Sequence, residues 1–128
     1  MSDLLIVDDE KFIRDLLLEH LSAKHSCVAA ENAEEAMAVL AANSFKVVLT
    51  DIWMPGVSGL DLLDHVNARY PALVVIIIST DLEGSRIAVR RGAFDYVTKP
   101  FDLSHVGEAV NRALRHWKGN VSKADSPK

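Results

Sequence analysis

The stretch Leu-Thr-Asp-Ile-Trp-Met-Pro-Gly-Val-Ser-Gly, residues 49–59, decides how this 128-residue chain is interpreted. The apolar run 45–50, in which only Lys46 is charged, predicts a buried strand that ends at Asp51. A Pro-Gly turn follows, and Gly59 opens a predicted helix. An acid at the carboxyl end of a buried strand stands where open α/β sheets bind ligands. Taken alone, Asp51 is explained better as a turn residue, because Asp commonly ends strands in that role.

The composition is that of one globular domain. The chain is 49% hydrophobic and 25% charged, and its net charge of -4 does not indicate broad electrostatic binding to nucleic acid. Cys27 is the only cysteine, which excludes an intrachain disulfide and suits a reducing compartment. The longest apolar run, 73–78, is too short to span a membrane, and no signal peptide precedes the first strand. We therefore expect a cytoplasmic protein with no membrane partner.

Five short apolar runs alternate with five stretches of helical periodicity. The runs are apolar at successive positions, which predicts a parallel sheet covered by helices on both faces, an α/β fold. The expected buried stripes include Phe12 in the first helix and Ala41 in the second, and the polar residues 120–128 are expected to be disordered. The predicted strands are 4–7, 26–30, 45–50, 73–78 and 94–98, and the predicted helices are 11–23, a segment capped by Asn32, 59–69, 82–91, and a segment from the cap Asp102 to Gly119.

Polar side chains follow four of the five predicted strands. In a parallel sheet, all of these strand ends lie at the same edge. Each residue alone has an ordinary explanation as a helix cap, a loop hydroxyl or a solvated amine. Their convergence on one edge favours a functional site. The residues are Asp8 and Asp9 after the first strand, Asp51 after the third, Ser79 and Thr80 after the fourth, and Thr98 and Lys99 after the fifth.

The residue types at this edge point to phosphate chemistry. Crowded carboxylates cannot all stay ionised without a cation, and Lys99 supplies only one positive charge. Mg²⁺ accepts one or two carboxylates together with water and phosphate oxygens. A carboxylate beside such an ion and an amine can attack a phosphoryl group and carry an aspartyl phosphate. No Walker loop or dinucleotide motif is present, and the five histidines show no paired metal-ligand spacing.

With these residues in place, the chain resembles the receiver domain of two-component response regulators. The resemblance implies a flavodoxin-like, doubly wound sheet of five parallel strands in the order 2-1-3-4-5. The resemblance covers about residues 3–117. The expected receiver domain is 1–118, with 119–128 expected as a flexible polar tail or the start of a linker. The matching motifs are Val7-Asp8-Asp9-Glu10, Asp51-Ile52-Trp53-Met54-Pro55-Gly56 with Gly59, Ser79 after an apolar strand, and residues 92–101, which include Asp95-Tyr96-Val97-Thr98-Lys99-Pro100.

The resemblance also implies the roles of the acidic residues. Asp51 is expected to accept a phosphoryl group from a histidine of a sensor kinase or a histidine phosphotransfer protein. Asp9 is expected to bind Mg²⁺ (or Mn²⁺) directly, and Asp8 mostly through water. The backbone carbonyl of Trp53 completes the expected metal site. The chain would thus be a phospho-accepting regulatory domain that catalyses only its own phosphorylation and dephosphorylation, and not otherwise an enzyme.

Further roles are implied at the ends of the last two strands. Lys99 is expected to pair with the phosphoryl group, and its bond to Pro100 is expected to be cis. Ser79 is expected to be the switch hydroxyl, with Tyr96 as the aromatic side chain that turns inward with it. Thr80, beside Ser79, stays open as an alternative.

Several functional alternatives remain at this stage. A receiver fold can also serve as a protein-interaction module that does not use phosphate, whereas a phosphatase is disfavoured because no second catalytic acid stands beside Asp51. The segment 79–92 is short and contains Gly84, which leaves the output surface unspecified. Output through a downstream protein, an output domain or a dimer is compatible with the sequence. Trp53 is hypothesised to shield the acyl phosphate; equal phosphate lifetimes in wild type and Trp53→Ala would refute this.

Overall fold

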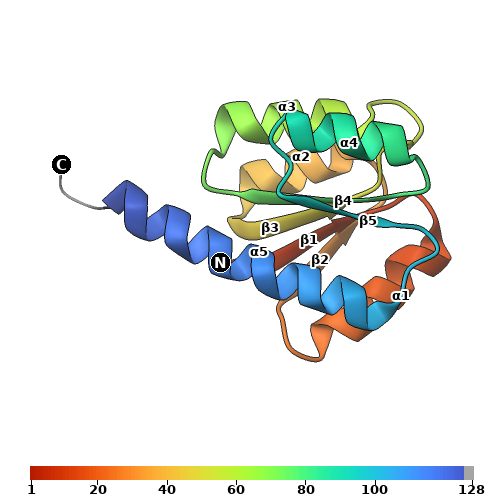
Figure 1. The fold of residues 1–128 in the computed structure, drawn as a ribbon, viewed down its shortest axis with the longest axis horizontal. Helices are drawn as coiled ribbons and strands as arrows, with labels where there is room; N and C mark the ends of the chain where they lie inside the picture. Colours follow the sequence, from red (N-terminus) through yellow and green to blue (C-terminus); the bar gives the residue numbers. More distant parts are fainter. Residues whose placement is uncertain (126–128) are drawn as a thin grey trace.

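The computed structural model describes residues 1–125, with the surroundings of side chains up to residue 119. Strands and helices alternate along the chain, as the periodicity predicted (Figure 1). The strands are β1 (Ser2–Val7), β2 (Cys27–Ala30), β3 (Phe45–Thr50), β4 (Val74–Ser79) and β5 (Asp95–Thr98). The helices are α1 (Lys11–Ser22), α2 (Ala33–Ala42), α3 (Gly59–Arg69), α4 (Leu82–Arg90) and α5 (Leu103–Asp125).

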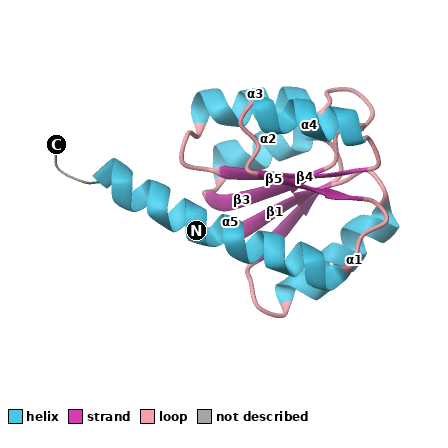
Figure 2. Ribbon diagram, viewed as in Figure 1, coloured by secondary structure: helices cyan, strands magenta, loops and turns pink. Residues whose placement is uncertain are grey.

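The five strands form one parallel sheet in the order β2-β1-β3-β4-β5, which confirms the expected topology. Helices α2, α3 and α4 cover one face of the sheet, and α1 and α5 cover the other (Figure 2). Val7 pairs with Thr50, and Ser79 pairs with Thr98, so the polar residues that follow these strands reach the same edge.

Successive residues of the central strands pack into two separate cores. Leu5 and Val7 of β1 join the core under α2, α3 and α4, whereas Leu4 and Ile6 join the core under α1 and α5. The strands β3 and β4 alternate in the same way. This arrangement explains why the central residues of these strands are apolar at successive positions, since both sheet faces are buried.

The buried stripes of two helices differ from the prediction. Phe12 is 76% exposed and Ala41 is exposed, so neither contributes to the core. At about 100° per residue, each lies roughly 140° around its helix from a buried residue five positions away, Leu17 and Ala36 respectively. The predicted cap of α2 is confirmed, because the side chain of Asn32 accepts a hydrogen bond at 2.7 Å from the backbone of the first turn.

Helix α5 does not end at Gly119 as predicted but continues to Asp125, beyond the rest of the domain (Figure 1). A glycine inside a helix costs only about 1 kcal/mol, and Gly119 lies in open surroundings where an added Cβ would meet nothing within 4 Å. The expected disorder is therefore wrong for residues 120–125, and residues 126–128 lie outside the described part. The division between a domain and a tail at residue 119 stays a prediction. Of the helices described, none combines the length and apolar character needed to cross a bilayer.

Candidate functional site

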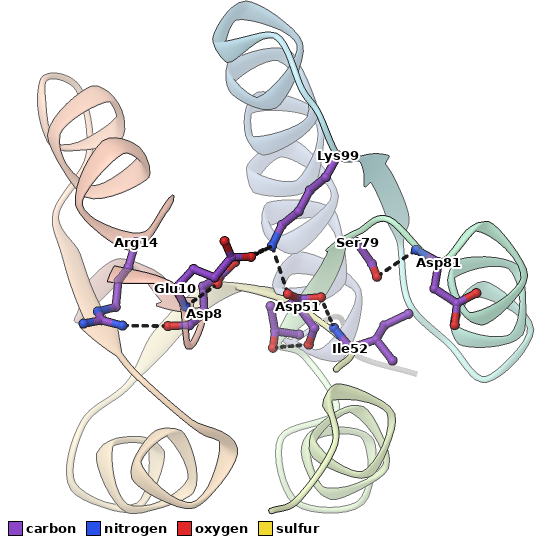
Figure 3. Close-up of polar contacts among 9 residues, drawn as sticks. Asp8, Glu10, Arg14, Asp51, Ile52, Ser79, Asp81 and Lys99 are labelled. Atoms are coloured by element: carbon purple, nitrogen blue, oxygen red, sulfur yellow. Dashed lines mark hydrogen bonds and ion pairs between the residues drawn. The ribbon is translucent and has the colours of Figure 1, made fainter. Parts of the chain in front are cut away.

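The carboxyl edge of the sheet brings together three charged side chains from different strands. Asp8 follows β1, Asp51 follows β3 and Lys99 follows β5 (Figure 3). Lys99 Nζ lies 2.9 Å from Asp8 Oδ2 and 2.9 Å from Asp51 Oδ2, and 3.5 Å from Glu10 Oε1. One amine thus joins two carboxylates that are 43 residues apart in the chain (51 − 8).

The three groups are largely removed from water. The side chains of Asp8, Asp51 and Lys99 are 2%, 10% and 9% exposed. Burial raises the pKa of Asp8, and the hydrogen bond from Lys99 offsets this only in part. Burial alone lowers the pKa of Lys99, but hydrogen bonds to Asp51 and Asp8 outweigh it and leave that pKa raised. The lysine is therefore held in its charged form between two acids that it cannot fully neutralise.

A third acid makes the site suitable for a divalent cation. One carboxylate oxygen from each of Asp8, Asp9 and Asp51 lies within 4.8 Å of the other two. Carboxylates are the hard oxygen ligands that Mg²⁺ prefers. Asp9 is exposed while the other two are buried, so the cluster opens to solvent on one side. The acids predicted as metal ligands thus come together in a set that fits Mg²⁺.

Local hydrogen bonds fix both buried acids. The backbone N–H of Glu10 donates to Asp8 Oδ1 at 2.9 Å, and that of Ile52 donates to Asp51 Oδ1 at 2.7 Å. The guanidinium of Arg14 donates to the backbone carbonyl of Asp8 at 2.8 Å. Each carboxylate therefore has one oxygen held by its own loop and the other held by Lys99.

Gly59 allows the start of α3 to approach the site closely. Its N–H donates to the carbonyl of Ile52 at 2.7 Å. A Cβ at this position would lie 1.9 Å from the backbone oxygen of Asp51, which is too close for any other residue. The glycine that the sequence placed at the helix start is thus required by its distance from the candidate acceptor.

The hydroxyl residues after β4 lie in different surroundings. Ser79 is 1% exposed, and its Oγ accepts a hydrogen bond from the backbone N–H of Asp81 at 3.1 Å (Figure 3). Thr80 is exposed. Tyr96 is half-buried and packs against the core under α2, α3 and α4. The buried position next to the charged cluster favours Ser79 over Thr80 as the candidate switch, while the roles of all three residues stay predictions.

Trp53, two residues after Asp51, is 61% exposed. Its indole N–H donates to Asp81 Oδ2 at 2.8 Å. The other carboxylate oxygen of Asp81 accepts a hydrogen bond from the backbone N–H of Gly84 at 2.9 Å, which makes Asp81 the N-cap of α4. The hydrogen bonds from Gly84 and Trp53 lower the pKa of Asp81, so this acid is ionised.

Comparison with known proteins decides the family. A family model described as the response regulator receiver domain matches residues 4–111. The chain is a receiver domain of two-component response regulators. It therefore belongs to the regulatory proteins of two-component signalling, as the resemblance implied. The bond between Lys99 and Pro100 is cis, which confirms that expectation as well.

Relatives of the receiver domain include longer regulators. This chain is 41% identical over 116 residues to the DNA-binding transcriptional regulator NtrC of Salmonella typhimurium, and the match covers 88% of this chain and 25% of NtrC. It is 42% identical over 114 residues to the response regulator PilR of Pseudomonas aeruginosa, covering 87% and 26%. The crystal structure of the NtrX receiver domain from Brucella abortus is 38% identical with a TM-score of 0.84, covering 88% and 98%. The chain thus spans about a quarter of the length of these curated relatives.

Two features of the receiver site were not predicted from the sequence. Arg14, in α1, supports the loop that carries Asp8 and Asp9 by donating to the backbone carbonyl of Asp8. The pair formed by Trp53 and Asp81 joins positions 28 residues apart. The only sequence signal for Arg14 is its place in the first helical turns after the acids, and no sequence signal indicates the second contact.

Proposed function

We propose that this receiver domain is a phosphorylation-dependent switch in which Asp51 accepts the phosphoryl group of a phosphohistidine. The donor would be a sensor histidine kinase or a histidine phosphotransfer protein. The observation that supports this most strongly is the shared contact of Lys99 with Asp51 and Asp8, because it places a buried amine beside a carboxylate at the open edge of the sheet.

The geometry supports a direct displacement. An oxygen of Asp51 attacks the phosphorus, the bond from phosphorus to the histidine nitrogen breaks, and the electron pair of that bond returns to the imidazole. Hydrogen bonds from Ile52 and Lys99 already orient the acceptor carboxylate, which reduces the orientational entropy lost on reaction. As the phosphoryl group arrives, the amine of Lys99 can exchange its contact with Asp51 for the phosphoryl oxygens and stabilise their charge.

Asp8, Asp9, Asp51 and the backbone carbonyl of Trp53 would hold Mg²⁺ (or Mn²⁺). When bound, the ion supplies positive charge that neutralises the phosphoryl oxygens. The carboxylate spacing supports the first three of these assignments. Arg14 and the N–H of Glu10 keep the loop of Asp8 in place for this role.

The response to phosphorylation would begin at Ser79. Its hydroxyl would leave the N–H of Asp81 and bond the new phosphoryl oxygens, and Tyr96 would move inward with it. Such a change alters the surface near α4 and β5. Because the curated relatives are about four times as long as this chain, we propose that the surface controls an attached output domain or a separate protein.

Intact mass after incubation with acetyl phosphate and Mg²⁺ tests the proposal. We expect the wild type to gain the mass of one phosphoryl group and to lose this gain when Mg²⁺ is chelated. Asp51→Asn should show no gain, whereas Asp61→Asn, a matched change at an exposed acid of α3, should behave as wild type. No gain in the wild type would instead support a phosphate-independent interaction module, and a gain retained in Asp51→Asn would refute the acceptor assignment.

A further inference from the structure

Asp81 connects the candidate site to helix α4 through four of its own polar groups. Its N–H donates to Ser79 Oγ at 3.1 Å, and its carbonyl accepts from the backbone N–H and the hydroxyl of Ser85, each at 2.9 Å. One carboxylate oxygen caps α4 at the N–H of Gly84, and the other accepts from the indole of Trp53 at 2.8 Å. Three of these four groups bond within the segment from β4 to α4, and only the indole comes from another part of the chain.

We propose that the hydrogen bond between Trp53 and Asp81 is a latch that stabilises the unphosphorylated conformation. It links the loop after the acceptor strand to the first turn of α4. The inference rests on the proposed function, because it requires Ser79 to change partners when Asp51 is phosphorylated.

The position of Trp53 supports a polar rather than a packing role. With 61% of its surface exposed, this side chain contributes little to either core. Its N–H nevertheless finds an ionised acceptor at short range, and hydrogen bonds to charged groups are about twice as strong as neutral ones. Contact with Asp81 is therefore the feature that accounts for where the indole lies.

The coupling follows from the partners of Asp81. When the hydroxyl of Ser79 turns to a phosphoryl group, the N–H of Asp81 loses its acceptor unless the segment moves with Ser79. Trp53 opposes that movement because it holds the carboxylate of the same residue from across the site. A ligand shifts a two-state equilibrium only by its difference in affinity for the two states, so a bond present in one state alone lowers the affinity for the phosphoryl group.

The test compares the binding of beryllium trifluoride, an analogue of the phosphoryl group, by calorimetry in the presence of Mg²⁺. Trp53→Phe keeps an aromatic ring and removes the donor. Asp81→Asn keeps an oxygen for the N-cap but turns the other group into a donor that cannot accept from the indole. Trp117→Phe makes the same aromatic change in α5, where the ring lies near Lys46 at the opposite edge of the sheet. Affinity for Mg²⁺ alone and the free energy of unfolding are measured for each variant.

We expect Trp53→Phe to bind the analogue about threefold to tenfold more tightly, since one charged hydrogen bond at an exposed position is lost. Trp117→Phe should stay within about twofold of wild type in its affinity for the analogue and for Mg²⁺. Because the backbone carbonyl of Trp53 belongs to the proposed metal site, the analogue affinities of all variants are compared at saturating Mg²⁺. Asp81→Asn should raise the affinity for the analogue more in the wild-type background than in Trp53→Phe. Only the wild-type background still contains the hydrogen bond between Trp53 and Asp81 that this substitution removes. Equal or weaker analogue binding by Trp53→Phe, or equal effects of Asp81→Asn in both backgrounds, would overturn the latch alone. A wild type that neither binds the analogue nor is phosphorylated would overturn the proposed function and the latch with it.

Discussion

Replacing Lys99 with methionine should show how strongly the site depends on its one buried amine. Methionine keeps most of the aliphatic stem, so the main loss is the charge and its two hydrogen bonds at 2.9 Å. Asp8 and Asp51 would remain buried without a counter-charge. Removing one partner of a buried ion pair typically destabilises a protein by about 3–5 kcal/mol.

Protonation of Asp8 limits the destabilisation of the Lys99→Met variant. From its ordinary pKa of 3.8, neutralising this acid at pH 7 costs at most about 4 kcal/mol, and each unit of lower pH reduces that cost by about 1.4 kcal/mol. In Lys99→Met the folded protein keeps this proton to a higher pH than the unfolded chain does. Stability therefore falls as the pH rises from the ordinary value through the raised pKa. We expect a destabilisation of about 3–4 kcal/mol at pH 7 and about 2 kcal/mol at pH 5.

Urea unfolding, followed by circular dichroism with and without Mg²⁺, measures these differences. Lys24→Met provides the matched control, because Lys24 is exposed in the turn after α1. Its free energy of unfolding should stay within about 0.5 kcal/mol of wild type at both pH values. Mg²⁺ should stabilise Lys99→Met more than wild type, since the crowded acids then lack any other cation. Stability equal to wild type, or a deficit that does not shrink between pH 7 and pH 5, would refute this account of the site.

Three further predictions concern the supports of the site. Gly59→Ala should lower the free energy of unfolding by at least about 3 kcal/mol, because the new Cβ overlaps the backbone oxygen of Asp51, whereas Gly119→Ala should be neutral or stabilising; thermal unfolding compares the two. Arg14→Gln should weaken Mg²⁺ binding about tenfold in calorimetric titration by freeing the loop after β1, and unchanged affinity would show that the guanidinium does not position that loop. Asn32→Ala should cost about 1 kcal/mol in urea unfolding through loss of the α2 cap; no loss would mean that the 2.7 Å bond is not stabilising.

The parts of the fold set by local pattern could be predicted from the sequence. Strand β3 and helix α3 have the predicted bounds, because an apolar run and a clear stripe are each bordered by turn residues. Asp8, Asp51 and Lys99 could be placed together because parallel strands bring their carboxyl ends to one edge. The prediction for Phe12 was wrong, because the spacing of apolar residues along a helix did not identify which side of α1 meets the sheet.

Contacts between loops could not be predicted from the sequence. The approach of Trp53 to Asp81 depends on how two connections fold over the edge of the sheet, and neither residue belongs to a periodic pattern. The return of Arg14 to the carbonyl of Asp8 depends on the side-chain conformation, which spacing does not determine. At Gly119 a residue that often ends helices was tolerated within α5, because nothing in the chain required a turn there.

The alternation of the two cores along β1, β3 and β4 has a consequence for how the strands find their alignment. If β3 slipped by one residue against β1, Val47, Val48 and Leu49 would exchange cores, yet each would still place an apolar side chain in a core. Hydrophobic patterning alone therefore selects the alignment only weakly. The acids at the strand ends do so more strongly, because a slip of about 3.3 Å would draw Asp51 into the sheet or push Ile52 into water. The proposed phosphoryl chemistry and the alignment of the strands thus depend on the same side chains.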